Sequence, residues 1–585
     1  MGGPTQCAEH SARNNRRDGY SVISGTRGRR LAAAITLGAT LLVGVAGCAT
    51  TEDDIHRWAD TLQGPRKLVA ILVHSKYPMA LRVEAAMTLI RMKARKGKRV
   101  GIQGDDDNMG LVGALAQLAP AERREIVTRM VPQLIAVMEQ PPPKGEEGRA
   151  APPDPSFPFK DAAFALLTHN DGALVTDAET RQKLKVALVD WTMVDFPARV
   201  DESSQIYGIE QILKYLQADG VRRLPDLIQP DAPKIDLISK LVAELGDEAT
   251  KTRASEKLVV VAKDINSEQW IERKKPDVAR ANKASKLEPN ERQFRAQLEQ
   301  YQEEELLRAF SSMKLVGEQP VVTYLLAFAA DSSHPAKRRA AALAALEGNL
   351  DENNKPQIDE ILKLARADDT PDEVRDQALR RVGEMPRALV INDLYELFGH
   401  SNWKVRWMAA ELVLKMSRTN QVAEFMDHLR GVEGMSLTEA WRYGTLIGSM
   451  KGEPKPSELV AKYSTDDNPV QARVSALGYY FENGSKEDLP KIKQYEDDKT
   501  ATPKCKPDSP GCEWKCTVGE GKDAKTYDIT TVGEFVKYCV EPALEKRSEA
   551  EATGQKDSDG KDEKQDENQD EKKNEKQDEN QDEKK

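Results

Sequence analysis

Aromatic residues are scarce in this 585-residue chain, at 5% of the total, and histidine occurs only seven times. None of the histidines belongs to an HExxH motif or to a pair at helical spacing, which argues against a catalytic metal site. The sequence also lacks the GxxxxGKS or GxxxxGKT loop of nucleotide-binding proteins, a strand-linked GxGxxG and the GxSxG of many hydrolases. We therefore expect no catalytic residues, no metal site and no cofactor.

Runs of Val, Ile, Thr and Tyr that would form strands are few, whereas Ala, Leu, Glu, Lys and Arg dominate the composition. These five residues favour helix, so the composition predicts an all-α protein. A chain of this length exceeds what one compact core usually supports. The alternatives are several domains or an extended repeat array.

Positive charge is not in excess, because the whole chain has a formal net charge of −10. Residues 1–47 hold six Arg against Glu9 and Asp18, so their removal would change the formal charge from −10 to −14. Binding to nucleic acid depends on clustered positive charge that neutralises phosphates. We therefore expect no nucleic-acid partner.

An uncharged apolar stretch of 17 residues, Leu31 to Gly47, follows the basic segment TRGRR. This length is at the lower limit for crossing a bilayer, and the stretch is rich in Gly and Ala. A signal peptide is therefore favoured over the alternative, a retained transmembrane helix. The stretch ends in Val45, Ala46, Gly47 and Cys48.

The VAGC sequence resembles the lipobox of bacterial lipoproteins. The resemblance implies that residues 1–47 are removed as a signal peptide and that Cys48 is lipidated. Because Ala49 rather than Asp follows the cysteine, it also implies transfer to the outer membrane, at the periplasmic face or the cell surface. Two or three acyl chains anchor a protein stably where one would be marginal. The expected partner of the N-terminus is thus the membrane.

Four segments in the second half of the chain align without gaps: HPAKRRAAALAAL, TPDEVRDQALRRV, SNWKVRWMAAELV and NPVQARVSALGYY. Each has Arg four positions after a Pro or its equivalent, and Ala three positions after that Arg. A further unit at 435–450 has Ala440 in the Arg position, and a weak one at 156–167 has Lys160. Including two units upstream, the repeat arginines are Arg82, Arg253, Arg339, Arg375, Arg406 and Arg473.

These units resemble HEAT repeats, in which two antiparallel helices are joined by a turn and the second helix opens with Val-Arg. The resemblance implies an α-solenoid, with each repeat Arg paired to an Asp of the adjacent turn; the candidates are Asp331, Asp368, Asp369, Asp466 and Asp467. Such an array builds an extended surface that usually binds other proteins. A plain helical bundle with accidental similarity is the alternative.

Two classes of function follow from these patterns. The first is a non-enzymatic scaffold or adaptor, tethered to the membrane, that binds an envelope protein whose identity the sequence does not give. The second is an envelope enzyme, such as a hydrolase or lyase, with convergent carboxylates in the groove of the solenoid. The absence of a catalytic constellation favours the scaffold. His334 and His400, which precede repeat arginines, are interpreted as solvated turn residues rather than metal ligands.

Four cysteines lie near the C-terminus, at Cys505, Cys512, Cys516 and Cys539. Their spacing does not provide the two tight Cys pairs of most zinc modules, and an exported protein meets an oxidising environment. We therefore expect two disulfides, with Cys505–Cys516 and Cys512–Cys539 slightly favoured among three pairings. A short hairpin from Lys515 to Ile529 and a Thr-capped helix after it are also predicted.

The chain ends in a charged segment in which residues 562–573 and 574–585 are a nearly perfect duplication. With nothing apolar to bury, this tail is predicted to be disordered. The expected organisation is a signal peptide (1–47), an N-terminal helical-repeat arc (48–265), a charged helical insertion or hinge (266–316), HEAT-like repeats (317–500), a disulfide-linked module (501–545) and the tail (546–585).

Overall fold

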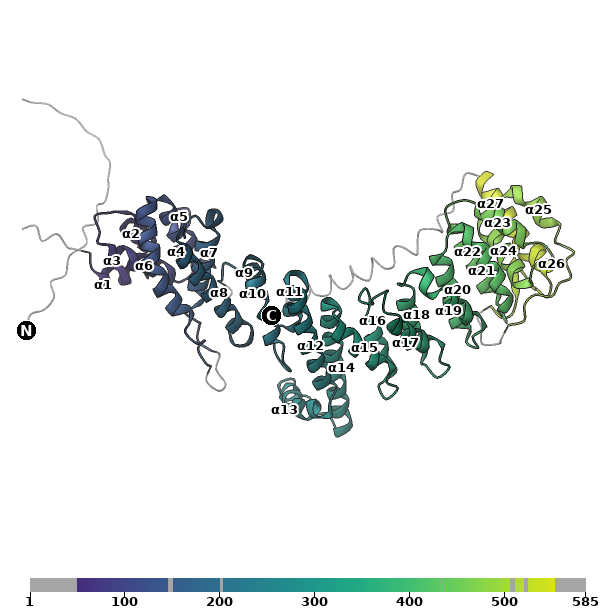
Figure 1. Cartoon of the computed structure of the whole chain (residues 1–585), viewed down its shortest axis with the longest axis horizontal. Helices are drawn as coiled ribbons and strands as arrows, with labels where there is room; N and C mark the ends of the chain where they lie inside the picture. Colours follow the sequence, from purple (N-terminus) through teal and green to yellow (C-terminus); the bar gives the residue numbers. More distant parts are fainter. Residues whose placement is uncertain are drawn as a thin grey trace, which may run out of the picture.

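The computed structural model describes residues 50–145, 151–199, 204–432, 434–505, 511–519 and 524–552. Over these residues the chain is almost entirely helical, which confirms the predicted all-α class. The helices follow one another in an elongated, curved row, from the purple N-terminal end to the yellow C-terminal end in Figure 1. None of the described helices has the length and apolar composition needed to cross a membrane.

Two predicted regions lie outside the described residues. One contains the lipobox residues Val45, Ala46 and Gly47 and the predicted lipidation site Cys48. The other is the predicted tail from residue 553 onward, whereas its first residues, 546–552, are helical rather than disordered.

The first part of the row buries its own hydrophobic core, which extends from Ile55 to Leu216. Aliphatic residues at spacings of three and four residues supply this core, for example Leu68, Ile71 and Leu72 on α2. The helices are α1 (Glu52–Trp58), α2 (Gly64–Val73), α3 (Met79–Arg91), α4 (Val100–Gln103), α5 (Gly110–Gln117), α6 (Pro120–Met138), α7 (Phe157–Thr168), the 3-10 turn η1 (His169–Gly172), α8 (Ala178–Ala198) and α9 (Ile209–Leu216).

A second core continues without a break from Met193 to Leu544. Helix α8 contributes to both cores, so the change from one to the other falls at α8 and α9 rather than at the predicted hinge. The next elements are α10 (Ala218–Val221), η2 (Leu224–Leu227), α11 (Ile235–Leu245) and α12 (Glu248–Ile265).

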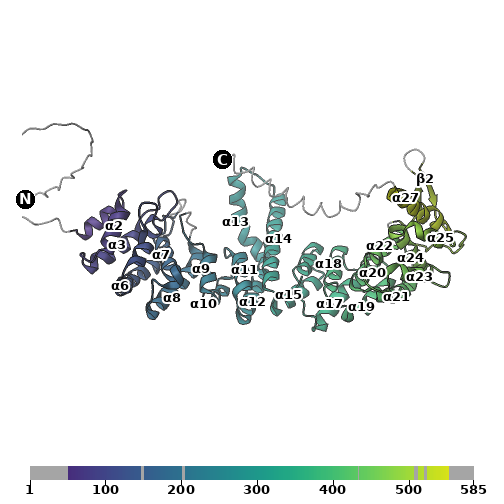
Figure 2. The ribbon, with the colours of Figure 1, turned by 90° about the horizontal axis from the view of Figure 1, so that it is seen from above.

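The segment 266–316 forms a helical hairpin of α13 (Glu268–Ala284) and α14 (Glu291–Val316). The hairpin projects from the row in Figures 1 and 2. The second half of α14 packs back against α11 and α12 through buried residues such as Leu306 and Phe310. The segment is therefore a helical insertion whose base belongs to the continuous core.

Helix pairs follow the hairpin. Pro stands at the N-cap of several second helices, as at Pro335 with φ −55° and ψ 141°, a backbone that proline favours. The elements are α15 (Gln319–Ala330), α16 (Ala336–Ala344), α17 (Lys355–Arg366), α18 (Asp372–Val382), α19 (Arg387–Glu396), η3 (Leu397–Gly399), α20 (Trp403–Met416), η4 (Thr419–Gln421), α21 (Val422–His428), η5 (Leu429–Gly431), α22 (Leu437–Ser449), α23 (Pro456–Tyr463) and α24 (Val470–Asn483).

The chain then enters the cysteine module, which carries the antiparallel hairpin of β1 (Lys515–Val518) and β2 (Lys525–Asp528). The hairpin lies within the predicted range, and Thr531 caps the following helix by accepting a hydrogen bond from the Glu534 N–H. The remaining elements are η6 (Lys486–Asp488), α25 (Leu489–Lys493), α26 (Val532–Phe535), the π-helical turn η8 (Val536–Val540) and α27 (Glu541–Ala552).

Two disulfides are present, as predicted, but the favoured pairing was wrong. The bonds are Cys505–Cys512 and Cys516–Cys539. Cys516 lies on the buried face of β1, which packs against the turn that carries Cys539. That contact leaves Cys505 and Cys512 to close a short loop, with a sequence separation of 7. The pairing thus depends on which face of a strand Cys516 occupies.

Candidate functional site

Five of the six repeat arginines are buried: Arg82, Arg339, Arg375, Arg406 and Arg473. Each lies on a helix that also presents apolar residues to the core. The exception is Arg253 on α12, whose side chain is 44% exposed and forms an ion pair with Asp226 at 2.6 Å.

Buried repeat arginines donate hydrogen bonds to carbonyls at the C-terminal ends of the preceding helices. Arg82 Nε donates to the carbonyl of Leu72, in the last turn of α2, at 2.9 Å. Arg339 Nε donates to the carbonyl of Ala329, in the last turn of α15, at 2.7 Å. The last four carbonyls of a helix have no partner within it, and a buried polar group left unpaired costs about 1–3 kcal/mol. The repeat arginine therefore fixes the turn of its own helix pair.

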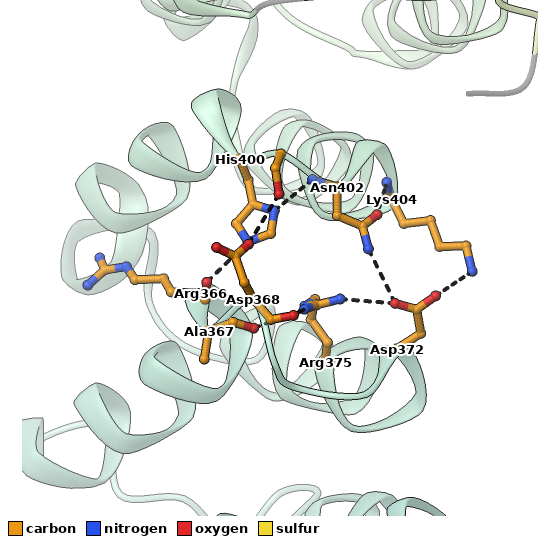
Figure 3. A network of polar contacts seen from close by, with 9 residues as sticks. Arg366, Ala367, Asp368, Asp372, Arg375, His400, Asn402 and Lys404 are labelled. Carbon is orange, nitrogen blue, oxygen red and sulfur yellow. Dashed lines mark hydrogen bonds and ion pairs between the residues drawn. The ribbon is translucent and has the colours of Figure 1, made fainter. Parts of the chain in front are cut away.

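Arg375 makes the same kind of contact with main-chain carbonyls and also donates a hydrogen bond to a carboxylate, as Figure 3 shows. Its Nη2 donates to the carbonyls of Ala367 at 2.9 Å and Asp368 at 3.3 Å. Its Nη1 donates to the carboxylate of Asp372 at 2.9 Å. The guanidinium thus joins the end of α17 to the start of α18.

The carboxylate of Asp372 also connects this pair to the next one (Figure 3). It accepts hydrogen bonds from Asn402 Nδ2 at 3.3 Å and from Lys404 Nζ at 2.8 Å, both at the start of α20. The hydrogen bond from Lys404 holds the pKa of Asp372 below its ordinary value, and the same contact raises the pKa of Lys404. Neighbouring turns are therefore linked by an exposed ion pair.

His400 is a second connection between the two turns. Its Nδ1 accepts a hydrogen bond from the Asn402 N–H at 3.0 Å, so Nε2 carries the proton and donates to the Arg366 carbonyl at 3.1 Å. The His400 side chain is only 9% exposed. The interpretation of His400 as a solvated turn residue was therefore wrong, because the ring fills the space between two turns.

The acidic partners of the arginines also differ from those predicted. Arg473 forms an ion pair with Asp498, and Arg375 forms one with Asp372. Of the candidates in the preceding turns, Asp368 contacts Arg375 through its carbonyl rather than its carboxylate. The helix end brings main-chain oxygens to the guanidinium, and the charged partner comes from wherever an acidic side chain is in reach.

Ala440 occupies the Arg position of α22, and the packing of α22 on α24 gives the reason. A Cβ added to Gly444 would lie 2.3 Å from the main-chain N of Tyr479. A Cβ added to Gly478 would lie 2.6 Å from the carbonyl O of Ala440. Because the two backbones touch here, small residues are required along this crossing.

A buried charged cluster surrounds Lys160, which has the Arg position of the weak repeat at 156–167. Lys160 Nζ donates to the carbonyl of Tyr207 at 2.7 Å and lies 2.8 Å from the Asp161 carboxylate. The same carboxylate accepts from Arg99 Nε at 3.2 Å and from the Ile206 N–H at 2.9 Å. Burial lowers the pKa of Lys160, and the charge of Asp161 opposes this effect. The cluster ties α7 to the segment that leads into α9.

Several open grooves lie on the surface of the row, and two of them differ clearly in the character of their lining. One, of about 770 Å³, lies at the base of the α13–α14 hairpin and is lined by charged groups of both signs, including Glu299, Glu303 and Arg338. The other, of about 910 Å³, lies between α6 and α8 and has an apolar floor that includes Val131 and Val186. These grooves are the candidate binding surfaces of the described chain.

A strongly perturbed carboxyl group lies elsewhere, at the start of α27. Burial and the adjacent carboxyl of Glu496 raise the pKa of Glu541 to about 7. Neither residue lines either groove described above. This acid pair lies in the C-terminal module, where α27 packs against α24 and α25.

Within the described residues, no group of three or more His, Cys, Asp or Glu side chains is arranged to hold a metal ion. No known protein-family model matches the sequence, and no curated protein matches it either.

Proposed function

We propose that the protein is a non-enzymatic scaffold or adaptor of the bacterial cell envelope that binds another protein along its row of helices. The observation that carries this proposal is the elongated row itself, in which successive helix pairs are fixed by buried arginines (Figure 1). Each helix pair contacts mainly its neighbours, so the array has a large surface for its mass. We further propose that the row is a HEAT-like α-solenoid, which the repeated Arg and Ala positions support.

The second part of the proposal is a lipid anchor at Cys48. The basic segment, the apolar stretch and the VAGC sequence support it. Acylation would tether the N-terminus to the outer membrane, and the row would extend from that point. The partner is then an envelope protein that meets the tethered surface.

Crosslinking in intact cells tests the scaffold. Cells that carry the full-length protein are treated with a short amine-reactive crosslinker, the protein is captured, and the crosslinked peptides are identified by mass spectrometry. We expect a small set of envelope proteins whose crosslinks map onto the helical row. Crosslinks that map only to the segment after Ala552, or an enriched set no larger than in a mock capture, would refute the proposal.

Intact-mass analysis tests the anchor separately. We expect a mature chain that begins at Cys48 and carries acyl groups. We also expect the Cys48→Ser variant to be absent from the membrane fraction. A chain that begins upstream of Cys48 without acylation would show that the lipid anchor is wrong, whatever the crosslinks show.

A further inference from the structure

The groove between α6 and α8 has several apolar residues in its lining, which we call its floor. Val131, Pro132 and Ile135 on α6 and Val186 and Ala187 on α8 line it. Val186 is 49% exposed, although it lies in the middle of a 21-residue helix. The volume of about 910 Å³ is large enough for several apolar side chains.

Pro132 interrupts the hydrogen bonding of α6 beside this groove. It lies inside α6 and has no N–H, so the carbonyl of Thr128 lacks the helical donor that position 132 would otherwise supply. Thr128 is itself a lining residue.

The rim of the groove is negatively charged. Glu139, Asp177, Glu179 and Asp190 line it, and the one cationic lining residue is Lys183. Hydrogen bonds from Thr180 hold the pKa of Asp177 below its ordinary value, so this carboxylate keeps its charge in mildly acidic solution.

Three of these carboxylates have cationic neighbours within the chain, since Arg124 and Lys183 lie near Asp177. Glu179 pairs with Lys183 at 2.6 Å, and both side chains are mostly exposed. Asp190 pairs with Arg223, and about half of each of these side chains is exposed. Exposed pairs of this kind are worth little and exchange readily with solvent. Carboxylates therefore outnumber the single lysine among the lining residues and are accessible to an incoming cation.

We propose that this groove is the docking site for a cationic amphipathic helix of the partner protein. This inference rests on the proposed scaffold function and assigns it a surface. The apolar face of the helix would cover Val186 and the floor, which is the usual way that a helix occupies a groove. Its Lys and Arg residues would face the carboxylates of the rim, which gives orientation and speeds association.

A pair of synthetic peptides tests the chemistry directly. One is a Leu/Lys peptide patterned as an amphipathic helix, and the other is the same pattern with Glu in place of Lys. Binding of each fluorescent peptide to the full mature protein is measured by anisotropy. We expect saturable binding of the Leu/Lys peptide, weakened by salt, and no saturable binding of the Leu/Glu peptide.

Two variants of one helix provide a matched comparison. Val186→Glu places a charge on the floor, whereas Val194→Glu changes a valine of the same helix that is 38% exposed and does not line the groove. We expect Val186→Glu to weaken binding of the Leu/Lys peptide by about 10-fold or more, because a charge would be buried against leucine. We expect Val194→Glu to bind within about 2-fold of the wild type, as surface changes away from a site usually do.

A charge-reversal variant keeps the test valid if Val186→Glu is poorly folded. Glu179→Lys alters only the exposed rim, and we expect it to lower both the affinity for the Leu/Lys peptide and its dependence on salt. Equal binding by the wild type, Val186→Glu and Glu179→Lys would overturn the docking site, as would equal binding of the two peptides. If Val186→Glu still captures the same envelope proteins in cells, the groove is wrong while the scaffold stands. If the wild type captures none, the scaffold fails independently of the groove.

Discussion

Replacing Gly444 with Ala would test whether the close crossing of α22 and α24 holds the C-terminal half of the row together. The three atoms nearest to an added Cβ all belong to the backbone: the N of Tyr479 at 2.3 Å and the C and O of Gly478 at 2.4 and 2.8 Å. None of them can rotate away, so the two helices would have to separate by about 1 Å to restore ordinary contact.

Two effects of opposite sign determine the size of the change. Gly444 lies inside α22, so alanine would favour the helix by about 1 kcal/mol. Overpacking of a well-packed interior costs about 1–3 kcal/mol and sometimes more. Because the clash involves main-chain atoms, we expect the upper end of that range, and a net destabilisation of about 2 kcal/mol.

Hydrogen exchange is the suitable assay, because it reports the opening of individual helices in a long array. A net loss of about 2 kcal/mol should lower the protection of amides in α22 and α24 on the order of 30-fold, while α2 and α3 keep theirs. Gly399→Ala is the matched control, since an added Cβ there meets no atom within 4 Å. Protection in α22 that is unchanged, or that rises as helix propensity alone would dictate, would refute the reasoning.

Three further predictions follow from other contacts. Arg406→Leu should lower the melting temperature and the protection of α20, because the buried guanidinium donates to two carbonyls of its turn, whereas Arg253→Leu at an exposed site should have little effect. The raised pKa of Glu541, about 7, means that folding stability declines as the pH rises from about 4.5 through 7, because the folded protein favours the neutral acid. Glu541→Gln keeps this side chain neutral, so it should raise the melting temperature at pH 8 and change it little at pH 5. Cys516→Ser should destabilise α27 by about 2–4 kcal/mol in hydrogen exchange, and equal protection in both proteins would contradict this.

Features set by a local pattern were predictable from the sequence. The helix pairs follow from apolar spacing, and the repeat arginines were found because Pro, Arg and Ala recur at fixed offsets. Their burial is a consequence of the same pattern, since position 406 or 375 falls on the face of the second helix that meets the first. The Thr531 cap and the hairpin were likewise predicted from a few adjacent residues.

Features that depend on contacts between distant segments were not predictable. The pairing of Cys516 with Cys539 requires knowledge of which face of β1 turns inward, and the location of His400 requires the neighbouring turn. The groove between α6 and α8 arises from two helices that are separated in the sequence by α7, although Pro132 inside a helical pattern was a signal of irregularity there. Lys160 could have been recognised as a buried residue, because it occupies the position of the repeat Arg.

The sequence separation between each arginine and the carbonyl that it contacts determines which insertions and deletions the chain tolerates. Arg82 and Arg339 each donate to a carbonyl ten residues earlier, within the same helix pair. A pair that is duplicated or deleted as a whole therefore carries both the donor and the acceptor of this hydrogen bond with it. The contacts between pairs would need new partners, and they include the exposed ion pair of Lys404 with Asp372 and the hydrogen bond of His400 with the Arg366 carbonyl. Gain or loss of whole pairs is thus tolerable, whereas an insertion between the acceptor carbonyl and its arginine is not.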